Sequence, residues 1–99
     1  MSQVVMSMRW AGVTPGQYEE AREVINWEGD VPDGAVLHVA GFDNDGIRVN
    51  DVWESAEHFN QFVESRLMPG VQEIGIQGQP DVEFYPVQNV FNAKAPAAA

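Results

Sequence analysis

The chain has 99 residues, with fifteen acidic side chains against five basic ones and no cysteine. This length suits one domain, which we predict to span residues 1–92, followed by a flexible Ala-rich tail over residues 93–99. The few Arg and Lys residues are scattered, which argues against nucleic acid as a partner. Without cysteine the chain can form neither a disulfide nor a thiolate metal site.

The N-terminal sequence and the overall hydropathy indicate a location. No basic region followed by an apolar run marks a signal peptide, and no apolar stretch approaches the roughly 18 residues that a membrane helix needs. We therefore expect a cytoplasmic protein with no membrane contact. The net charge of −10 is expected to serve solubility.

The first predicted strand and helix are set by periodicity and by capping residues. Residues 2–10 alternate between apolar and mixed side chains, which is typical of a strand. Thr14 and Pro15 then begin a helix, because threonine caps helix N-termini and proline suits the first helical position. Gln17 completes a capping box with Thr14. The helix is expected to fade near Trp27.

A hairpin follows. Residues 35–42 form an apolar strand that only His38 interrupts, and residues 47–53 form its partner. Between them, residues 43–46 (Asp-Asn-Asp-Gly) provide turn chemistry. A second helix is predicted to begin after Ser55 and to be interrupted at Pro69 and Gly70, with one further turn after them.

A fourth strand around residues 82–86 completes the order strand, helix, strand, strand, helix, strand. This order predicts a ferredoxin-like α+β fold with an antiparallel sheet and both helices on one face. The strands carry apolar residues on both faces, so the uncovered face needs a partner. We expect two copies to pair sheet to sheet in a homodimer that encloses a space.

The segment from Asp51 to Ser55, with Trp53-Glu54-Ser55 at its end and Phe59 and Phe62 after it, resembles a signature of dimeric α+β barrel proteins. This superfamily includes antibiotic-biosynthesis-type monooxygenases, haem-degrading monooxygenases and small polyketide cyclases. The resemblance implies that Trp53 projects into a cavity under the second helix. Haem-degrading members carry an iron-ligating histidine at the position of Val63, so haem degradation is not expected.

Cofactor-free monooxygenases of this superfamily activate oxygen through an electron-rich substrate. The resemblance therefore implies an aromatic or polyketide-like substrate and no cofactor. Asn50, Trp53, Tyr18 and Arg66 are of the residue types that hold such a substrate. Arg66 shares a helix face with apolar residues, so it either pairs with a carboxylate or holds an anionic substrate. Trp10 and Trp27 are expected to serve packing or an interface.

His38 is the candidate catalytic residue, because a neutral imidazole titrates near pH 6.5 and can act as a general base. Turn length places it opposite Asp51, which would orient the ring, or opposite Trp53 if the turn is shorter. We expect the ring to point into the space between the paired sheets. The competing interpretation is a buried histidine that is hydrogen-bonded for structural reasons only.

No metal site is expected. The two histidines, His38 and His58, lie far apart in the sequence, and the loop from Asp43 to Gly46 lacks the glutamate of a calcium site. Two functions remain open at this point. One is a small enzyme, a cofactor-independent monooxygenase or a cyclase. The other is a non-catalytic ligand-binding or assembly module of the same fold, which a filled interior would favour.

Overall fold

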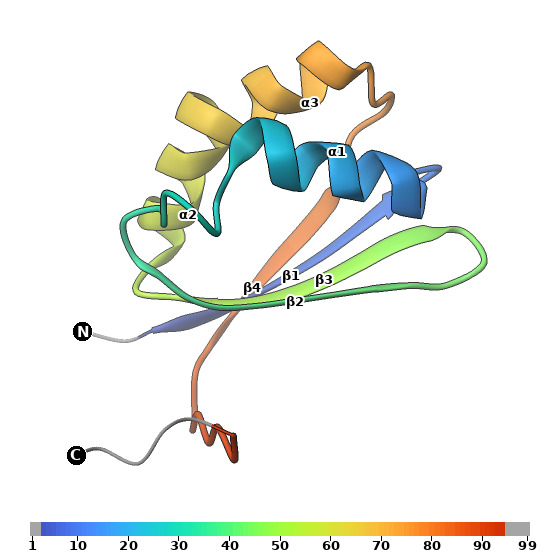
Figure 1. Cartoon of the computed structure of the whole chain (residues 1–99). Coiled ribbons are helices and arrows are strands. Elements are labelled where there is room, and N and C mark those ends of the chain that lie inside the picture. Colours follow the sequence, from blue (N-terminus) through green and yellow to red (C-terminus); the bar gives the residue numbers. More distant parts are fainter. Residues whose placement is uncertain (1–2, 95–99) are drawn as a thin grey trace.

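A computed structural model describes residues 3–94 of the chain. Its strands and helices alternate in the predicted order, with the second helical region divided into three consecutive segments (Figure 1). The elements are β1 (Val4–Ala11), α1 (Pro15–Ile25), β2 (Ala35–Phe42), β3 (Gly46–Trp53), α2 (Ala56–Phe62), the π-helical segment η1 (Val63–Leu67), α3 (Met68–Ile74) and β4 (Asp81–Pro86).

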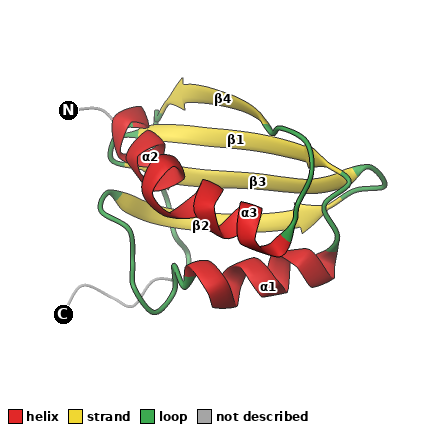
Figure 2. Cartoon of the chain, turned by 90° about the horizontal axis from the view of Figure 1, so that it is seen from above, coloured by secondary structure: helices red, strands yellow, loops and turns green. Residues whose placement is uncertain are grey.

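The four strands form one antiparallel sheet in the order β2-β3-β1-β4. Seen from above, the helices lie on one side of this sheet, with α2 and α3 crossing the strands and α1 running near the β2 edge (Figure 2). The predicted ferredoxin-like α+β architecture is confirmed. Within residues 3–94 the helices all lie on one face of the sheet, so no described helix covers the opposite face, which we call the uncovered face.

Helix α1 begins as the sequence predicts. The Thr14 hydroxyl accepts a hydrogen bond from the Gln17 backbone N–H, and the Gln17 side chain accepts one from the Thr14 backbone N–H. These two bonds satisfy donors that the first helical turn would otherwise leave open. The helix ends at Asn26, whose left-handed backbone (φ 58°) closes the last turn onto Arg22.

The second helical region differs from the prediction, because Pro69 and Gly70 do not interrupt it. A proline inside an α-helix removes one hydrogen-bond donor and crowds the preceding turn. Here the wider π-helical turn η1 precedes Pro69, and the Met68 N–H bonds to the Val63 carbonyl five residues back. The wider turn accommodates the proline, so the chain stays helical through Ile74.

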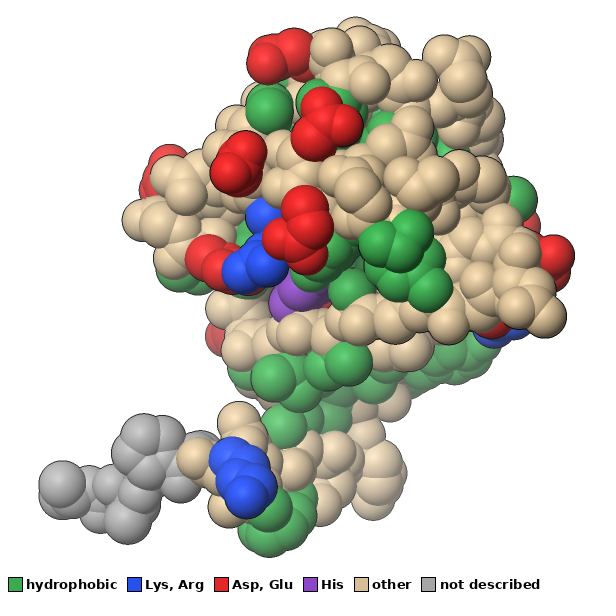
Figure 3. Space-filling model, turned by 45° about the vertical axis from the view of Figure 1, so that its right-hand side comes forward, with side chains coloured by type: hydrophobic (Ala, Val, Ile, Leu, Met, Phe, Trp, Pro, Cys, Tyr) green, Lys and Arg blue, Asp and Glu red, His purple; other side chains and the backbone are tan. Residues whose placement is uncertain are grey.

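The uncovered face of the sheet carries apolar side chains. Leu37 and Val39 of β2 and Tyr85 of β4 are exposed, and Val39 keeps 55% of its surface accessible. Figure 3 shows hydrophobic side chains along the side of the sheet away from the helices. An apolar second face was expected from the strand sequences, and these residues form it.

Two further features concern the ends and the surface. The predicted tail over residues 93–99 lies outside the described residues except for Ala93 and Lys94. None of the helices within residues 3–94 combines the length and the apolar character required to cross a bilayer.

Candidate functional site

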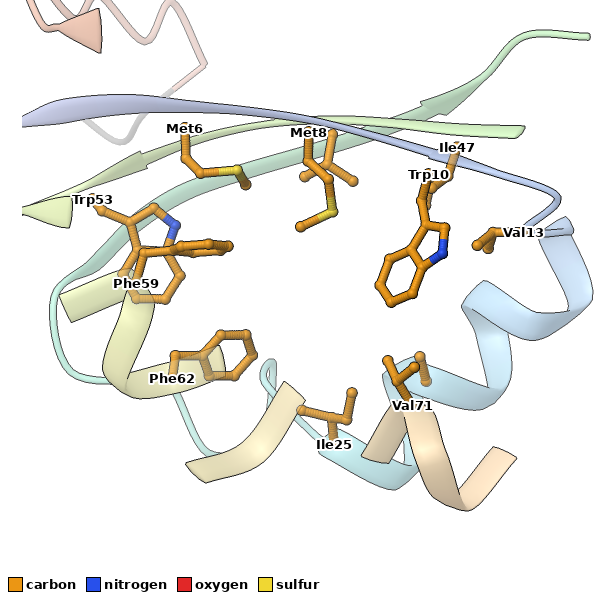
Figure 4. Close-up of a cluster of buried hydrophobic side chains, with 12 residues drawn as sticks. Met6, Met8, Trp10, Val13, Ile25, Ile47, Trp53, Phe59, Phe62 and Val71 are labelled. Atoms are coloured by element: carbon orange, nitrogen blue, oxygen red, sulfur yellow. The ribbon is translucent and has the colours of Figure 1, made fainter. Parts of the chain in front are cut away.

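A cavity of about 350 Å³ lies between the sheet and the helices. Side chains from both layers point toward it, with Met8, Trp10 and Trp53 on the sheet and Phe62 and Val71 on the helices (Figure 4). Its wall is almost wholly apolar. The volume falls at the lower end of the range of about 300–1,000 Å³ that ligand pockets occupy.

The hairpin register brings His38 to the wall of this cavity. Phe42 pairs with Ile47 across the turn, and counting back places His38 opposite Asp51, as the turn length predicted. The one irregularity of the β2–β3 ladder lies between Ala35 and Leu37, beyond His38. It therefore leaves the pairing of His38 with Asp51 intact.

His38 belongs to a chain of hydrogen bonds. Its Nδ1 atom lies 2.7 Å from Oδ1 of Asp51, and its Nε2 atom lies 2.8 Å from the Tyr18 hydroxyl. The other carboxylate oxygen of Asp51 accepts a hydrogen bond of 3.0 Å from the Trp53 indole N–H. Asp51 is buried, with 6% of its surface exposed, and each of its carboxylate oxygens has a partner, as is usual for buried polar groups.

This arrangement defines the tautomer of His38. An ionised carboxylate only accepts hydrogen bonds, so the proton of the neutral imidazole lies on Nδ1 and faces Asp51. Nε2 then carries a lone pair. Burial raises the pKa of Tyr18, which keeps its phenol protonated and able to donate to that lone pair. In the neutral ring, Nε2 of His38 is therefore the atom that can accept a proton.

The direction of the His38 side chain corrects one expectation. We expected the ring to face the space between two paired sheets, but it lies on the helix-covered face, on the cavity wall, with 32% of its side chain accessible. The physical reason is strand parity. Asp51 and Trp53 point toward the helices, and His38 shares their face because residues directly opposite in a ladder point the same way.

Trp53 occupies the place that the resemblance implied. Its ring packs against Phe59 and Phe62 of α2, with ring centroids 5.4 and 5.6 Å apart, and it lines the cavity. Only 3% of its surface is accessible. The same side chain thus contributes to the core, to the cavity wall and, through its N–H, to the orientation of Asp51.

Two residues that were predicted to bind substrate lie elsewhere. Asn50 precedes Asp51 in β3, so its exposed side chain points to the uncovered face of the sheet. The Arg66 guanidinium donates to the backbone carbonyls of Ile25 and Asn26, at 2.9 and 3.3 Å. A cation there stabilises the C-terminal end of α1, and Arg66 does not line the cavity.

Two residues at the site were not predicted. Trp27 lines the cavity with its ring centroid 5.4 Å from that of His38, and Glu28 lies beside it on the cavity wall. Both belong to the loop after α1. No periodicity in the sequence indicates where a loop folds back, so the pattern of residues carried no signal for them. An aromatic residue directly after a predicted helix end was the one hint.

Within residues 3–94, no three His, Asp or Glu side chains come together as a metal site would require. Of the ionisable side chains at the cavity, Tyr18, His38 and Asp51 form a chain of hydrogen bonds, while Glu28 pairs with Arg22. This arrangement can hold an imidazole as an acceptor, next to an apolar space large enough for a small molecule.

Comparison with known proteins places the fold. No protein-family model matches the chain, and no curated protein matches it either. Among solved structures, the chain is similar to NE2512, a protein of unknown function from Nitrosomonas europaea. That similarity covers 98% of this chain and 97% of the other, with a TM-score of 0.63 at 17% sequence identity. At this identity the likeness shows a shared fold.

Proposed function

We propose that the chain is a small-molecule enzyme in which His38 acts as a general base on an apolar substrate held in the cavity. The observation that carries this proposal is the position of Nε2, an oriented acceptor beside an apolar space of about 350 Å³. The His38 side chain is 32% accessible to solvent, so a substrate that fills the cavity would cover the imidazole and keep water from competing for the proton.

The substrate would present an acidic proton to Nε2 in place of the Tyr18 hydroxyl. Suitable groups are a phenol O–H or a C–H next to a carbonyl. Proton transfer leaves a phenolate or enolate in the cavity and a protonated imidazole between it and Asp51. The buried carboxylate stabilises that imidazolium through the Nδ1 hydrogen bond.

Two reactions start from such an anion, and both agree with the resemblance to dimeric α+β barrel proteins. In a monooxygenase without cofactor, the carbanion attacks molecular oxygen. A CH₂ group then becomes a carbonyl, one oxygen atom enters the product, and the other leaves as water with the two hydrogens. In a cyclase, the enolate carbon attacks a carbonyl of the same molecule. The shared first step is the abstraction by His38.

This first step can be tested with 2-tetralone, an uncharged bicyclic ketone with an acidic CH₂ group. In heavy water, the protein is expected to accelerate the exchange of those hydrogens above the buffer rate, measured by proton NMR. Oxygen uptake, followed with an electrode, distinguishes the monooxygenase from the cyclase. Binding of tetralone with exchange at the buffer rate would instead support the non-catalytic module.

We also propose that two copies pair through the uncovered sheet face. Leu37, Val39 and Tyr85 are exposed there, and a monomer rarely leaves such a patch open to water. Sedimentation velocity at micromolar concentration is expected to give twice the chain mass of 10.9 kDa. Val39→Glu should yield the monomer, because a charge would be buried in the interface.

The control for this prediction is Val24→Glu. Val24 lies on α1 and is 41% exposed, so it makes the same chemical change away from the sheet. It should leave the dimer intact. A wild-type chain that sediments as a monomer would contradict the pairing, as would a Val39→Glu variant that remains a folded dimer.

A further inference from the structure

On the wall of the cavity itself, the charged side chains are carboxylates. The acidic side chains that line it are Glu28 and Asp51, and among the described residues no Lys or Arg lines it. Asp51 lies at the inner end of the hydrogen-bonded chain, and it is buried. Glu28 has 59% of its side chain accessible, so it stands at the mouth where a ligand enters.

The arginines close to the site are already engaged. Arg22 donates to Glu28 through two nitrogens, at 3.0 and 2.8 Å, and to Glu19 at 2.8 Å. Arg66 caps the end of α1 through backbone carbonyls. The pKa of Glu28 is lowered, chiefly by the Arg22 hydrogen bond, so Glu28 stays ionised at neutral pH. The single guanidinium of Arg22 is therefore shared by two carboxylates, those of Glu19 and Glu28, and the third carboxylate, Asp51, is buried in the cavity wall.

We propose that the cavity accepts uncharged or cationic aromatic molecules and rejects carboxylates, with Glu28 as a specificity-determining residue. This inference rests on the proposed function and names its substrate class. Bringing a carboxylate into an apolar cavity requires a cation or several donors to replace its water. Among the described residues the wall offers the buried indole N–H of Trp27, which has no partner, but no Lys or Arg, and Glu28 and Asp51 repel the incoming charge.

An aromatic cation meets the opposite conditions. The rings of Tyr18 and Trp27 lie on the same wall, with centroids 5.7 Å apart, and aromatic faces attract cations. Glu28 adds a carboxylate at the mouth. An uncharged molecule carries no penalty of either kind. We therefore expect affinity to follow the charge of the ligand when its ring system is held constant.

Three naphthalene probes test this directly: 2-naphthylmethylammonium, 2-naphthalenemethanol and 2-naphthoate. They share one bicyclic ring and differ in charge. Isothermal titration with the wild-type chain is expected to rank the ammonium and the alcohol at least tenfold above the naphthoate. Salt at 0.5 M should reduce the difference in affinity between the ammonium and the naphthoate, because ions in solution screen the interaction between charges.

Two substitutions at the mouth should move the naphthoate affinity in opposite directions. Glu28→Gln removes a charge that repels naphthoate and frees the Arg22 guanidinium from its ion pair with Glu28. It should therefore raise the affinity for naphthoate about tenfold. Arg22→Gln leaves the Glu19 and Glu28 carboxylates without their cation and should lower the affinity for naphthoate below that of the wild type. The control is Glu64→Gln, an exposed carboxylate on η1 outside the cavity wall, which should change nothing.

The outcomes separate this inference from the proposed function. If naphthoate binds as tightly as the alcohol, or if Glu28→Gln leaves their ratio unchanged, the charge selection is wrong. Proton exchange at tetralone can still hold in that case. If none of the three probes binds to the folded chain, the cavity is no ligand site, and both proposals fall together.

Discussion

Replacing His38 with alanine is expected to reduce proton exchange at 2-tetralone at least 100-fold, because a positioned general base contributes roughly 10²–10⁴. The change removes the only oriented nitrogen acceptor in the chain of hydrogen bonds that links Tyr18 to Asp51. It also leaves one oxygen of a buried carboxylate without its donor, at a cost of about 1–3 kcal/mol in folding stability.

His38→Gln separates these two effects. The glutamine amide can donate to Asp51 but cannot accept a proton at neutral pH. It should restore much of the stability, measured by thermal denaturation, without restoring exchange. If His38→Gln exchanges like the wild type, the histidine is structural, and the catalytic interpretation is wrong.

Tyr18→Phe identifies which group meets the substrate. The Tyr18 hydroxyl occupies Nε2 in the absence of a ligand, so a phenylalanine there should leave exchange at the wild-type rate or above it. If Tyr18 itself passed the proton, the same change would abolish exchange. Phenylalanine keeps the aromatic ring of Tyr18, so the cavity wall keeps its shape.

Much of the fold could be predicted from the sequence because its signals are local. The capping box at Thr14 and the turn from Asp43 to Gly46 depend on a few neighbouring residues. The turn left two partners open for His38, Asp51 or, with a shorter turn, Trp53, and the structure has Asp51. Local sequence signals thus brought His38 and Asp51 together as one candidate pair of the site.

The rest of the site depends on which face of the sheet the helices cover and on how loops return to it. Asn50 had the right chemistry, but β-strand parity places it opposite Asp51's face. Arg66 does share a helix face with Phe62, since its guanidinium carbon lies 5.5 Å from the Phe62 ring centroid. That face also meets the carbonyl end of α1, where Arg66 bonds instead of lining the cavity. Trp27 and Glu28 reach the cavity from a loop without periodicity.

The second large effect concerns Asp51, which fixes the tautomer of His38. Asp51→Asn is expected to reduce exchange at least 100-fold, although the shape of the side chain hardly changes. The indole N–H of Trp53 is always a donor, so the asparagine turns its oxygen toward Trp53 and its NH₂ toward His38. Nδ1 must then accept, which moves the ring proton to Nε2 and removes the base.

If Asp51 acts by setting the tautomer of His38, a second substitution should restore exchange, which a purely structural role for Asp51 does not predict. In Asp51→Asn combined with Trp53→Phe, no indole N–H remains, and the asparagine can turn its oxygen toward His38 instead. Nδ1–H then regains an acceptor and Nε2 regains its lone pair. The double variant should exchange about tenfold faster than Asp51→Asn alone, even though it is less stable.

Trp53→Phe alone is the matched control. It removes one donor to Asp51 and part of the cavity wall, but it should keep clearly more exchange than Asp51→Asn because Oδ1 of Asp51 still accepts from His38. Nitrogen-15 chemical shifts of the His38 ring report the tautomer independently of activity. They should show protonated Nδ1 in the wild type and in the double variant, and protonated Nε2 in Asp51→Asn. A double variant that exchanges no faster than Asp51→Asn, with the same ring shifts in every variant, would contradict this explanation. If Asp51 acts by setting the tautomer, the exchange rate and the nitrogen-15 shifts must change together.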